Sequence, residues 1–193
     1  AVTATSRRRK FFNTFAHRNI FWRPPDPSNL LRNRPMNRTL DRIDFAILVA
    51  LQNDARRSNK ELAAHVGLAP SSCLARVRQL RAAGHLLGAH AVVAPAVLGI
   101  ELQALIRVRM ALHTRQAVAR FQEPLEGQPE VVDVFHVGGR HDFVIRVAVR
   151  DASHLRDLVV DGFTSRPEVA QVETSLVFEH RSKGVLPCYR TGD

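Results

Sequence analysis

The chain has 193 residues, with 28 Lys or Arg, 18 Asp or Glu, and a formal net charge of +10. This length suits one large or two small domains, and no apolar run approaches the roughly 18 residues that a membrane-spanning helix needs. The two cysteines, Cys73 and Cys188, offer neither a disulfide framework nor zinc-ligand spacing. We therefore expect a soluble, cytoplasmic protein.

The positive charge is concentrated toward the N-terminal end. Residues 1–39 hold nine basic and one acidic side chain, residues 40–88 hold seven and four, and residues 101–193 hold twelve and thirteen. Residues 1–38 lack a sustained hydrophobic period and contain the sequence PPDP, so we expect a disordered basic tail. We favour an extension upstream of Met36 that the fold does not need. A basic arm along DNA and an organellar transit peptide are the alternatives.

Two helices are expected after the tail. In TLDRIDFAILVALQND, Thr39 is a plausible N-cap, and apolar residues then recur at helical spacing. These residues are Leu40, Ile43, Ile47, Ala50 and Leu51. In SNKELAAHVGLAP, Ser58 and Glu61 form a capping box, and Gly67 supplies a turn to the next helix.

A third helix is predicted to begin at Pro70, in VGLAPSSCLARVRQL, and to end before Gly84. Its core-facing residues are Cys73, Leu74, Val77 and Leu80. The opposite face carries mostly small residues, namely Ser71, Ser72, Ala75, Gln79 and Ala82, with Arg76 and Arg78 on the two flanks. Taken alone, the pattern also fits a surface helix with ordinary solvated arginines.

The Gly-containing turn between the last two helices favours a helix-turn-helix DNA-binding unit. In that geometry the helix after the turn enters the major groove with its N-terminal residues first. Glutamine can pair bidentately with adenine, and arginine with guanine or with phosphate. The expected DNA-binding residues are Lys60, Pro70, Ser71, Ser72, Ala75, Arg76, Arg78 and Gln79.

After Gly84, the sequence HLLGAHAVVAP predicts a small strand pair or wing that leads into a linker. Strand and helix patterns then follow in the order βαββαβ, which is the ferredoxin-like arrangement. The predicted fold class is α+β. We expect a helix-turn-helix, winged-helix-like head at residues 39–88, a β linker at 89–100, a ferredoxin-like domain at 101–183 and a tail at 184–193.

The predicted sheet has two unequal faces. The face expected beneath the two helices consists of Leu102, Ile106, Val132, Val134, Phe143, Ile145, Val172, Leu176 and Phe178. The other face mixes apolar residues with charges of both signs, namely Leu105, Phe135, Val144, Val177, Arg107, Arg146, Asp133 and Glu173. Such a face suits a self-interface, so we expect a homo-oligomer, with a solvated face as the alternative.

The chain resembles the Lrp/AsnC family, the leucine-responsive and asparagine-responsive regulators of bacteria and archaea. The resemblance runs from about Leu40 to about Lys183 and is carried by three segments. These are LDRIDFAILVALQNDARRSNKELAAHVGLAPSSCLARVRQLRAAGHL, GGRHDFVIRV and PEVAQVETSLVFE. The resemblance implies a DNA-binding transcriptional regulator with a ligand-sensing ferredoxin-like domain, an amino-acid effector bound between subunits, no metal, and dimers that often assemble into octamers.

By position, the family's effector region falls on the hairpin residues Gly138, Gly139, Arg140, His141 and Asp142, and on Thr174, Ser175 and Leu176 of the last strand. Glycines let backbone amides approach a carboxylate, and Asp142 can pair with an α-ammonium. The family often has an aromatic residue where this chain has His141, so the effector's identity does not carry over. The alternative for GGRHD is an ordinary tight hairpin in which Asp142 pairs with Arg140.

Two other functions are alternatives to a regulator. His136, His141 and Asp142 invite comparison with a metal or acid–base site, but no nucleophile motif, phosphate loop or second ligand cluster accompanies them. We therefore expect no enzymatic activity. An architectural DNA-binding protein without an effector would use the same head, so this alternative stays open at the level of sequence.

Overall fold

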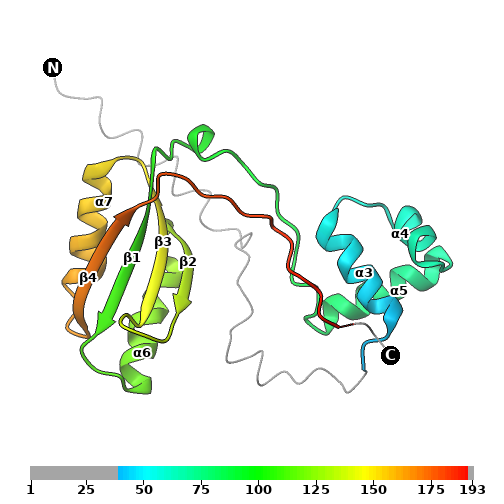
Figure 1. Cartoon of the computed structure of the whole chain (residues 1–193), viewed down its shortest axis with the longest axis horizontal. Coiled ribbons are helices and arrows are strands. Elements are labelled where there is room, and N and C mark those ends of the chain that lie inside the picture. The colour runs from blue at the N-terminus through cyan, green and yellow to red at the C-terminus, as the bar shows by residue number, and fades with distance from the viewer. Residues whose placement is uncertain (1–38, 191–193) are drawn as a thin grey trace, which may run out of the picture. The chain divides into compact units, whose positions relative to one another are not determined.

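A computed structural model describes residues 39–190, which form two compact units. The described part of the first unit comprises residues 39–90 and 183–190, and the second unit is Ala91–Ser182 (Figure 1). The basic tail expected at residues 1–38 lies outside the described residues. No helix in residues 39–190 is long and apolar enough to cross a membrane.

The first unit contains the three predicted helices, α3 (Arg42–Asn53), α4 (Asn59–Val66) and α5 (Pro70–Ala82). Their apolar stripes meet in one small core, as the helical spacing of these residues requires. The buried residues of this core are Ile47, Ala50, Leu62, Ala63, Cys73, Val77 and Leu80. Leu74, expected in the same core, is 38% exposed.

The helix termini confirm one predicted cap and correct another. Ser58 caps α4 and forms the expected reciprocal capping box with Glu61. The N-cap of α3 is Asp41 rather than Thr39, because the Asp41 side chain accepts from the backbone N–H of Asp44 and the Asp44 side chain accepts from that of Asp41. Gly67 ends α4 in the left-handed region, with φ of 70°, where a residue with a Cβ is strained.

The predicted wing and β linker are not present as strands. Residues 85–94 contain no strand, and a short 3₁₀ turn, η1 (Pro95–Leu98), precedes the second unit. A strand must exchange hydrogen bonds with a neighbour, and within the described residues no other segment forms a β-ladder with residues 85–94. Val92 and Val93 in this segment are 102% and 49% exposed.

The second unit has the predicted βαββαβ order. Its elements are β1 (Leu102–Met110), α6 (Arg115–Gln122), β2 (Val131–His136), β3 (Phe143–Val149), α7 (Ala152–Val159) and β4 (Val169–Leu176). Short helical turns, η2 (Glu123–Gly127) and η3 (Val160–Thr164), extend α6 and α7. The four strands pair antiparallel in the order β2-β3-β1-β4, which makes β1 and β3 the central strands.

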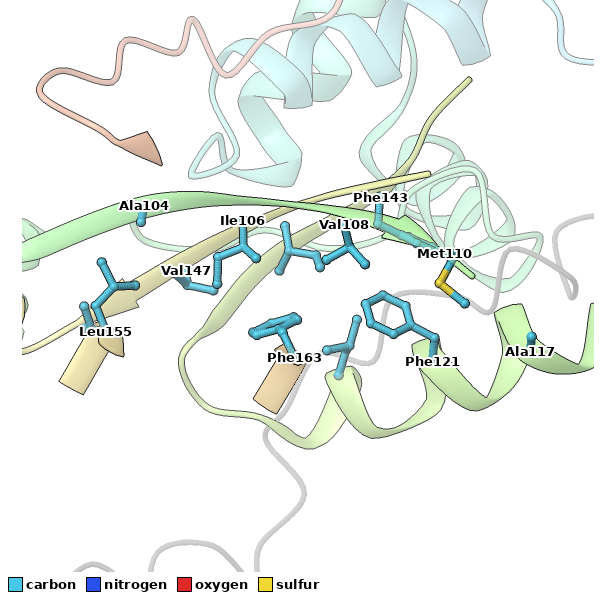
Figure 2. Packing of buried hydrophobic residues seen from close by; sticks show 13 residues of the cluster. Ala104, Ile106, Val108, Met110, Ala117, Phe121, Phe143, Val147, Leu155 and Phe163 are labelled. Atoms are coloured by element: carbon cyan, nitrogen blue, oxygen red, sulfur yellow. The ribbon is translucent and has the colours of Figure 1, made fainter. Parts of the chain in front are cut away.

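The core of this unit lies between one face of the sheet and helices α6 and α7, which Figure 1 shows on the same side. Phe121 of α6 lies between Phe143 of β3 and Phe163 of η3, with ring centroids 4.8 Å and 6.4 Å apart (Figure 2). From the central strands, alternate residues of β1 and β3 complete the core. They are Ala104, Ile106, Val108, Met110, Phe143, Ile145, Val147 and Val149.

Four residues predicted beneath the helices are instead exposed. Val132, Val134, Leu176 and Phe178 have exposed fractions of 46%, 37%, 48% and 97%. The first three lie on the edge strands β2 and β4, and Val132 also sits where the β2–β3 register shifts. Phe178 lies beyond the end of β4. Alternation predicted the face of a strand but could not show how far the two helices cover it.

The opposite face has the predicted mixed character. Cross-strand pairing puts Asp133 beside Arg146, Leu105 beside Arg146, and Arg107 beside Glu173. The Arg146 guanidinium donates to Asp133 Oδ2 at 2.6 Å, so these opposite charges satisfy one another within the face. Phe135 on the same face is 52% exposed.

Candidate nucleic-acid interface and ligand site

The outer face of α5 presents most of the residues predicted to contact DNA. Pro70, Ser71, Ser72, Ala75, Arg78 and Gln79 are all exposed. The opposite side of the helix is anchored by Cys73, Val77 and Leu80, which are buried in the head. Burial raises the pKa of the Cys73 thiol, so this cysteine acts as a small apolar residue.

The N-terminus of α5 is open to an anion. Its N-cap is Ala69, and no side chain caps the helix. Pro70 occupies the first turn and has no backbone N–H, so the uncapped amides of the first turn belong to the serines that follow. Backbone N–H groups and the helix dipole together make such a terminus a natural phosphate site.

Lys60 lies in the first turn of α4, where it is exposed. Arg56 precedes this helix and is also exposed, as is Arg81 one turn beyond Arg78 on α5. Arg56 and Arg81 are not among the DNA-binding residues predicted from sequence, although an arginine beside a helix-turn-helix is the signal that indicates them. The cationic surface of the head therefore extends past the predicted residues.

The structure gives Arg76 a different role from the one predicted. Its Nη1 atom donates to Asp41 Oδ2 at 2.6 Å and to Asp44 Oδ1 at 2.9 Å, both in the first turn of α3. These hydrogen bonds with Asp41 and then Asp44 raise the pKa of the guanidinium. Partial burial alone would raise the pKa of Asp41, but the hydrogen bonds from Arg76 and from backbone amides outweigh that effect and lower it. Arg76 is thus a contact between helices, not an outward-facing arginine.

A second polar contact holds the start of α5. The side-chain amide of Asn59, the first residue of α4, donates to the backbone carbonyl of Pro70 at 2.8 Å. This bond links the first turns of the two helices that flank the Gly67 turn. Sequence analysis missed Asn59 because its partner is a backbone carbonyl, which every residue possesses.

In the second unit, the predicted effector hairpin lies between β2 and β3. Gly138, Gly139 and Arg140 are exposed, and Gly139 has a φ of 125° that favours glycine. Asp142 is engaged within the fold, because Oδ2 accepts from the backbone N–H of Met110 at 2.7 Å. Oδ1 lies 3.0 Å from His113 Nε2. Asp142 therefore contacts Met110 and His113 instead of Arg140, and its side chain is only 17% exposed to solvent.

Glu173 of β4 is a further residue at this site that the effector prediction did not include. Its Oε2 atom lies 3.3 Å from His141 Nε2, within ion-pair range but without hydrogen-bond geometry. Its Oε1 atom lies 3.6 Å from the Arg140 guanidinium. The signal that would have found Glu173 is the strand register, which sets it opposite Arg107 on the same sheet face.

The other predicted effector residues, Thr174, Ser175 and Leu176, lie on β4. Ser175 and Leu176 pair with Leu105 and Ala104, whereas the hairpin leads into Phe143, which pairs with Val108. Along β1, Ala104 is four residues from Val108, about 13 Å at the usual rise of a strand, and Leu105 is three residues away. Ile106, which pairs with Thr174, is only two residues from Val108, about 7 Å. Thr174 and Ser175 also point to opposite faces of the sheet. Within one chain, therefore, Leu176 lies well away from the hairpin, whereas Glu173 and the adjacent Thr174 lie nearer to it.

His136 and His141, the two histidines considered above for a metal or acid–base site, each have a neighbour within the second unit. His136 stacks on Phe143, with ring centroids 4.6 Å apart and an interplanar angle of 17°. His141 faces Glu173, as described above. Across residues 39–190, no group of three or more His, Cys, Asp or Glu side chains is placed to hold a metal ion.

Comparison with known proteins gives consistent matches to both units. The AsnC-type helix-turn-helix domain matches residues 40–81, and the Lrp/AsnC ligand binding domain matches residues 103–186. The HTH-type transcriptional regulator AldR of Mycolicibacterium smegmatis is 42% identical over 143 residues, which cover 74% of this chain and 84% of that protein. The leucine-responsive regulatory protein of Escherichia coli K12 is 32% identical over 148 residues, covering 77% and 90%.

Solved structures agree with this result. A transcriptional regulator from Neisseria meningitidis, crystallised as a complex with L-Met, has a TM-score of 0.68 and 32% sequence identity. The match covers 77% of this chain and 97% of that one. E. coli AsnC has a TM-score of 0.64 and 25% identity, with coverage of 76% and 99%.

Proposed function

The chain belongs to the Lrp/AsnC family and is a DNA-binding transcriptional regulator, not an enzyme; we propose that α5 reads its operator and that an amino acid bound by the second unit controls it. The single observation that supports the DNA-binding part is the outer face of α5. Small exposed residues there allow close approach to a groove, and Arg78 and Gln79 stand beside them.

We assign distinct roles to the residues of this face. The uncapped first turn at Pro70, Ser71 and Ser72 receives a phosphate, and Ala75 lies against the base edges. Gln79 reads a base, Arg78 contacts phosphate, and Lys60 of α4 contacts the backbone beside the groove. We assign Arg76 no contact with DNA, because it forms ion pairs with Asp41 and Asp44.

The test begins with selection of bound sequences from random DNA duplexes by the purified chain. Gln79→Ala should then relax preference at one base pair by about 1–3 kcal/mol. Arg78→Ala should weaken binding to all sequences and reduce the salt dependence, as loss of one phosphate contact does. Unchanged binding in both variants would contradict this docking. A bounded footprint indicates regulation, whereas an extended cooperative one indicates an architectural role.

For the effector, we propose an amino acid held near Gly138, Gly139 and Arg140, with His141 and Glu173 beside it. The N. meningitidis regulator solved with L-Met supports this class of ligand. Exposed glycine amides and the Arg140 guanidinium suit a carboxylate. Glu173 is half-buried and lies 3.6 Å from the Arg140 guanidinium and 3.3 Å from the His141 ring, which places a carboxylate where an α-ammonium can approach. Leu176, which lies farthest from the hairpin of the three predicted β4 residues, would contribute to such a site from another copy of the chain.

We propose a dimer formed through the open sheet face, from which octamers assemble. The mixed apolar and charged face, with Phe135 half exposed, supports a second sheet as its cover. Because the chain is a DNA-binding regulator and its matched relatives are bacterial, we place its action in the cytoplasm. Sedimentation velocity tests the assembly, and a predominantly monomeric chain at micromolar concentration would contradict it.

The effector is sought by a thermal-shift screen of the twenty amino acids. A ligand at 1,000 times its Kd stabilises the folded chain by about 4 kcal/mol, which a melting curve resolves easily. Arg140→Ala should lose the shift, and Arg115→Ala, an exposed arginine on α6, serves as the control. Absence of a shift with every amino acid would contradict this part of the proposal.

A further inference from the structure

The direction in which α5 presents its outer side chains depends on the rotation of the helix about its axis. Successive residues of a helix are about 100° apart, so a modest roll turns a side chain away from the base it faces. The buried anchors Cys73, Val77 and Leu80 form a narrow apolar stripe of small and medium residues. Apolar packing is non-directional, so such a stripe defines the rotation less sharply than a directional polar contact does.

Arg76 supplies a directional contact of this kind. Its Nη1 atom bridges Asp41 and Asp44, which are themselves fixed by their reciprocal capping bonds at the start of α3. Each carboxylate uses one oxygen for a backbone N–H and the other for Arg76. The guanidinium is therefore attached to a rigid helix terminus, not to another mobile side chain.

The same geometry keeps Arg76 away from DNA. The Asp44 side chain is 3% exposed, and Arg76 provides the charge that compensates it. Departure of the guanidinium toward a phosphate would break its two hydrogen bonds, at 2.6 and 2.9 Å, and would remove a positive charge from beside the buried carboxylate of Asp44. Breaking one partner of a buried ion pair is strongly unfavourable, so Arg76 stays on α3 when DNA binds.

We propose that Arg76 is a positioning residue for DNA recognition. Through Asp41 and Asp44 it fixes the rotation of α5, and so the direction in which Ser72, Ala75 and Gln79 meet the bases, without touching DNA itself. This inference rests on the proposed use of α5 as the recognition helix. The Asn59 contact to Pro70 complements it by fixing the start of the same helix.

Asp41→Asn is the most informative variant. Asparagine is among the best N-cap residues, so α3 keeps its cap, while the charge that holds one side of Arg76 is lost. Asp44 still binds Arg76, which keeps the head folded where Arg76→Ala could unfold it. Ile47→Val, a change in the buried core of the head, is the stability control because it leaves the ion pair intact.

The measurement is the affinity of the full chain for its selected duplex and for a random duplex of equal length, over a range of salt concentrations and well below the melting temperature. For Asp41→Asn, we expect the ratio of specific to random affinity to fall about tenfold, the scale of one misaligned base contact. Affinity for random DNA and its salt dependence should stay as in the wild type. Ile47→Val should lower the melting temperature and leave the ratio unchanged.

Two results would overturn the inference. If Asp41→Asn lowers the melting temperature but preserves the ratio, the ion pair only stabilises the head. If the variant binds random DNA more tightly with a steeper salt dependence, Arg76 has been released and is a phosphate contact. Failure of the wild-type chain to select any sequence would instead refute the proposed function, which separates the two failures.

Discussion

Replacing Asp142 by alanine should destabilise the ligand-binding unit. The change removes the carboxylate that accepts from the Met110 N–H at 2.7 Å, at the end of a central strand where Met110 is 2% exposed. A hydrogen bond to a charged group contributes about 1.5–3 kcal/mol. The contact with His113, whose side chain is 67% exposed, adds under about 1 kcal/mol. We expect a loss of about 2–3 kcal/mol, or roughly 10–20 °C in melting temperature for a domain of this size.

Asp142→Asn separates this structural role from a ligand-binding one. The asparagine amide oxygen can still accept from the Met110 N–H, so most of the stability should remain. An effector's ammonium, in contrast, would lose its charge partner equally in both variants. Calorimetry of the full chain gives the two melting temperatures, and amide hydrogen exchange at Met110 reports the bond directly.

The reasoning would be refuted if both variants melted like the wild type and neither changed exchange at Met110. If both also lost the amino-acid response, Asp142 would be the ammonium partner that the sequence suggested. A large loss for alanine with a small loss for asparagine supports the geometry.

Three further predictions concern the first unit, one of them with a control glycine in the second unit. Because the pKa of Asp41 is lowered on folding, its contribution to stability is present above its ordinary value of 3.8 and is lost as the pH falls below it. Wild-type melting temperature should therefore fall more steeply below about pH 4 than that of Asp41→Asn. Cys188 is exposed, whereas Cys73 is buried and the pKa of its thiol is raised. A thiol reagent should therefore modify one cysteine in the native chain and two after denaturation. Rapid modification of both cysteines in the native chain would contradict the packing of Cys73. A Cβ at Gly67 would meet no atom within 4 Å, but the residue has a φ of 70°. Gly67→Ala should therefore lower the free energy of unfolding by about 1–2 kcal/mol through backbone strain alone. Gly127→Ala, at a position without a positive φ, should leave thermal unfolding nearly unchanged.

Periodicity predicted the helices of the first unit and the βαββαβ order of the second, and the predictions that were wrong have identifiable causes. The helices and strands follow from apolar spacing, and Ser58 with Glu61 is a local signal that needs no tertiary information. Thr39 and Asp41 are both acceptable caps by type, and the choice depends on Asp44 and on Arg76, which lies 32 residues further along the chain. The strand pair predicted at residues 85–94 is absent because a short apolar run does not by itself supply a pairing partner.

How much of each candidate site could be predicted from the sequence depended on whether its contacts are local or come from distant segments. The exposed face of α5 follows from the helical spacing of its own residues, so Ser72, Ala75 and Gln79 could be predicted from sequence. Whether Arg76 faces solvent or another helix depends on how α3 crosses α5, which no local pattern encodes. Glu173 and Asp142 owe their surroundings to β1, which separates their strands in the sheet although it precedes both in the chain.

The position of β1 also sets the order in which the protein is built during synthesis. The head needs only neighbouring helices, whereas β1 acquires its neighbours β3 and β4 much later in the chain. Local contacts form quickly and distant strand pairs slowly, so the head can fold while the sheet is still incomplete on the ribosome. Until β4 emerges, β1 has an unpaired edge that can template association between nascent chains. A chain that terminates before β4 would thus carry a finished recognition helix beside a sheet with an aggregation-prone edge.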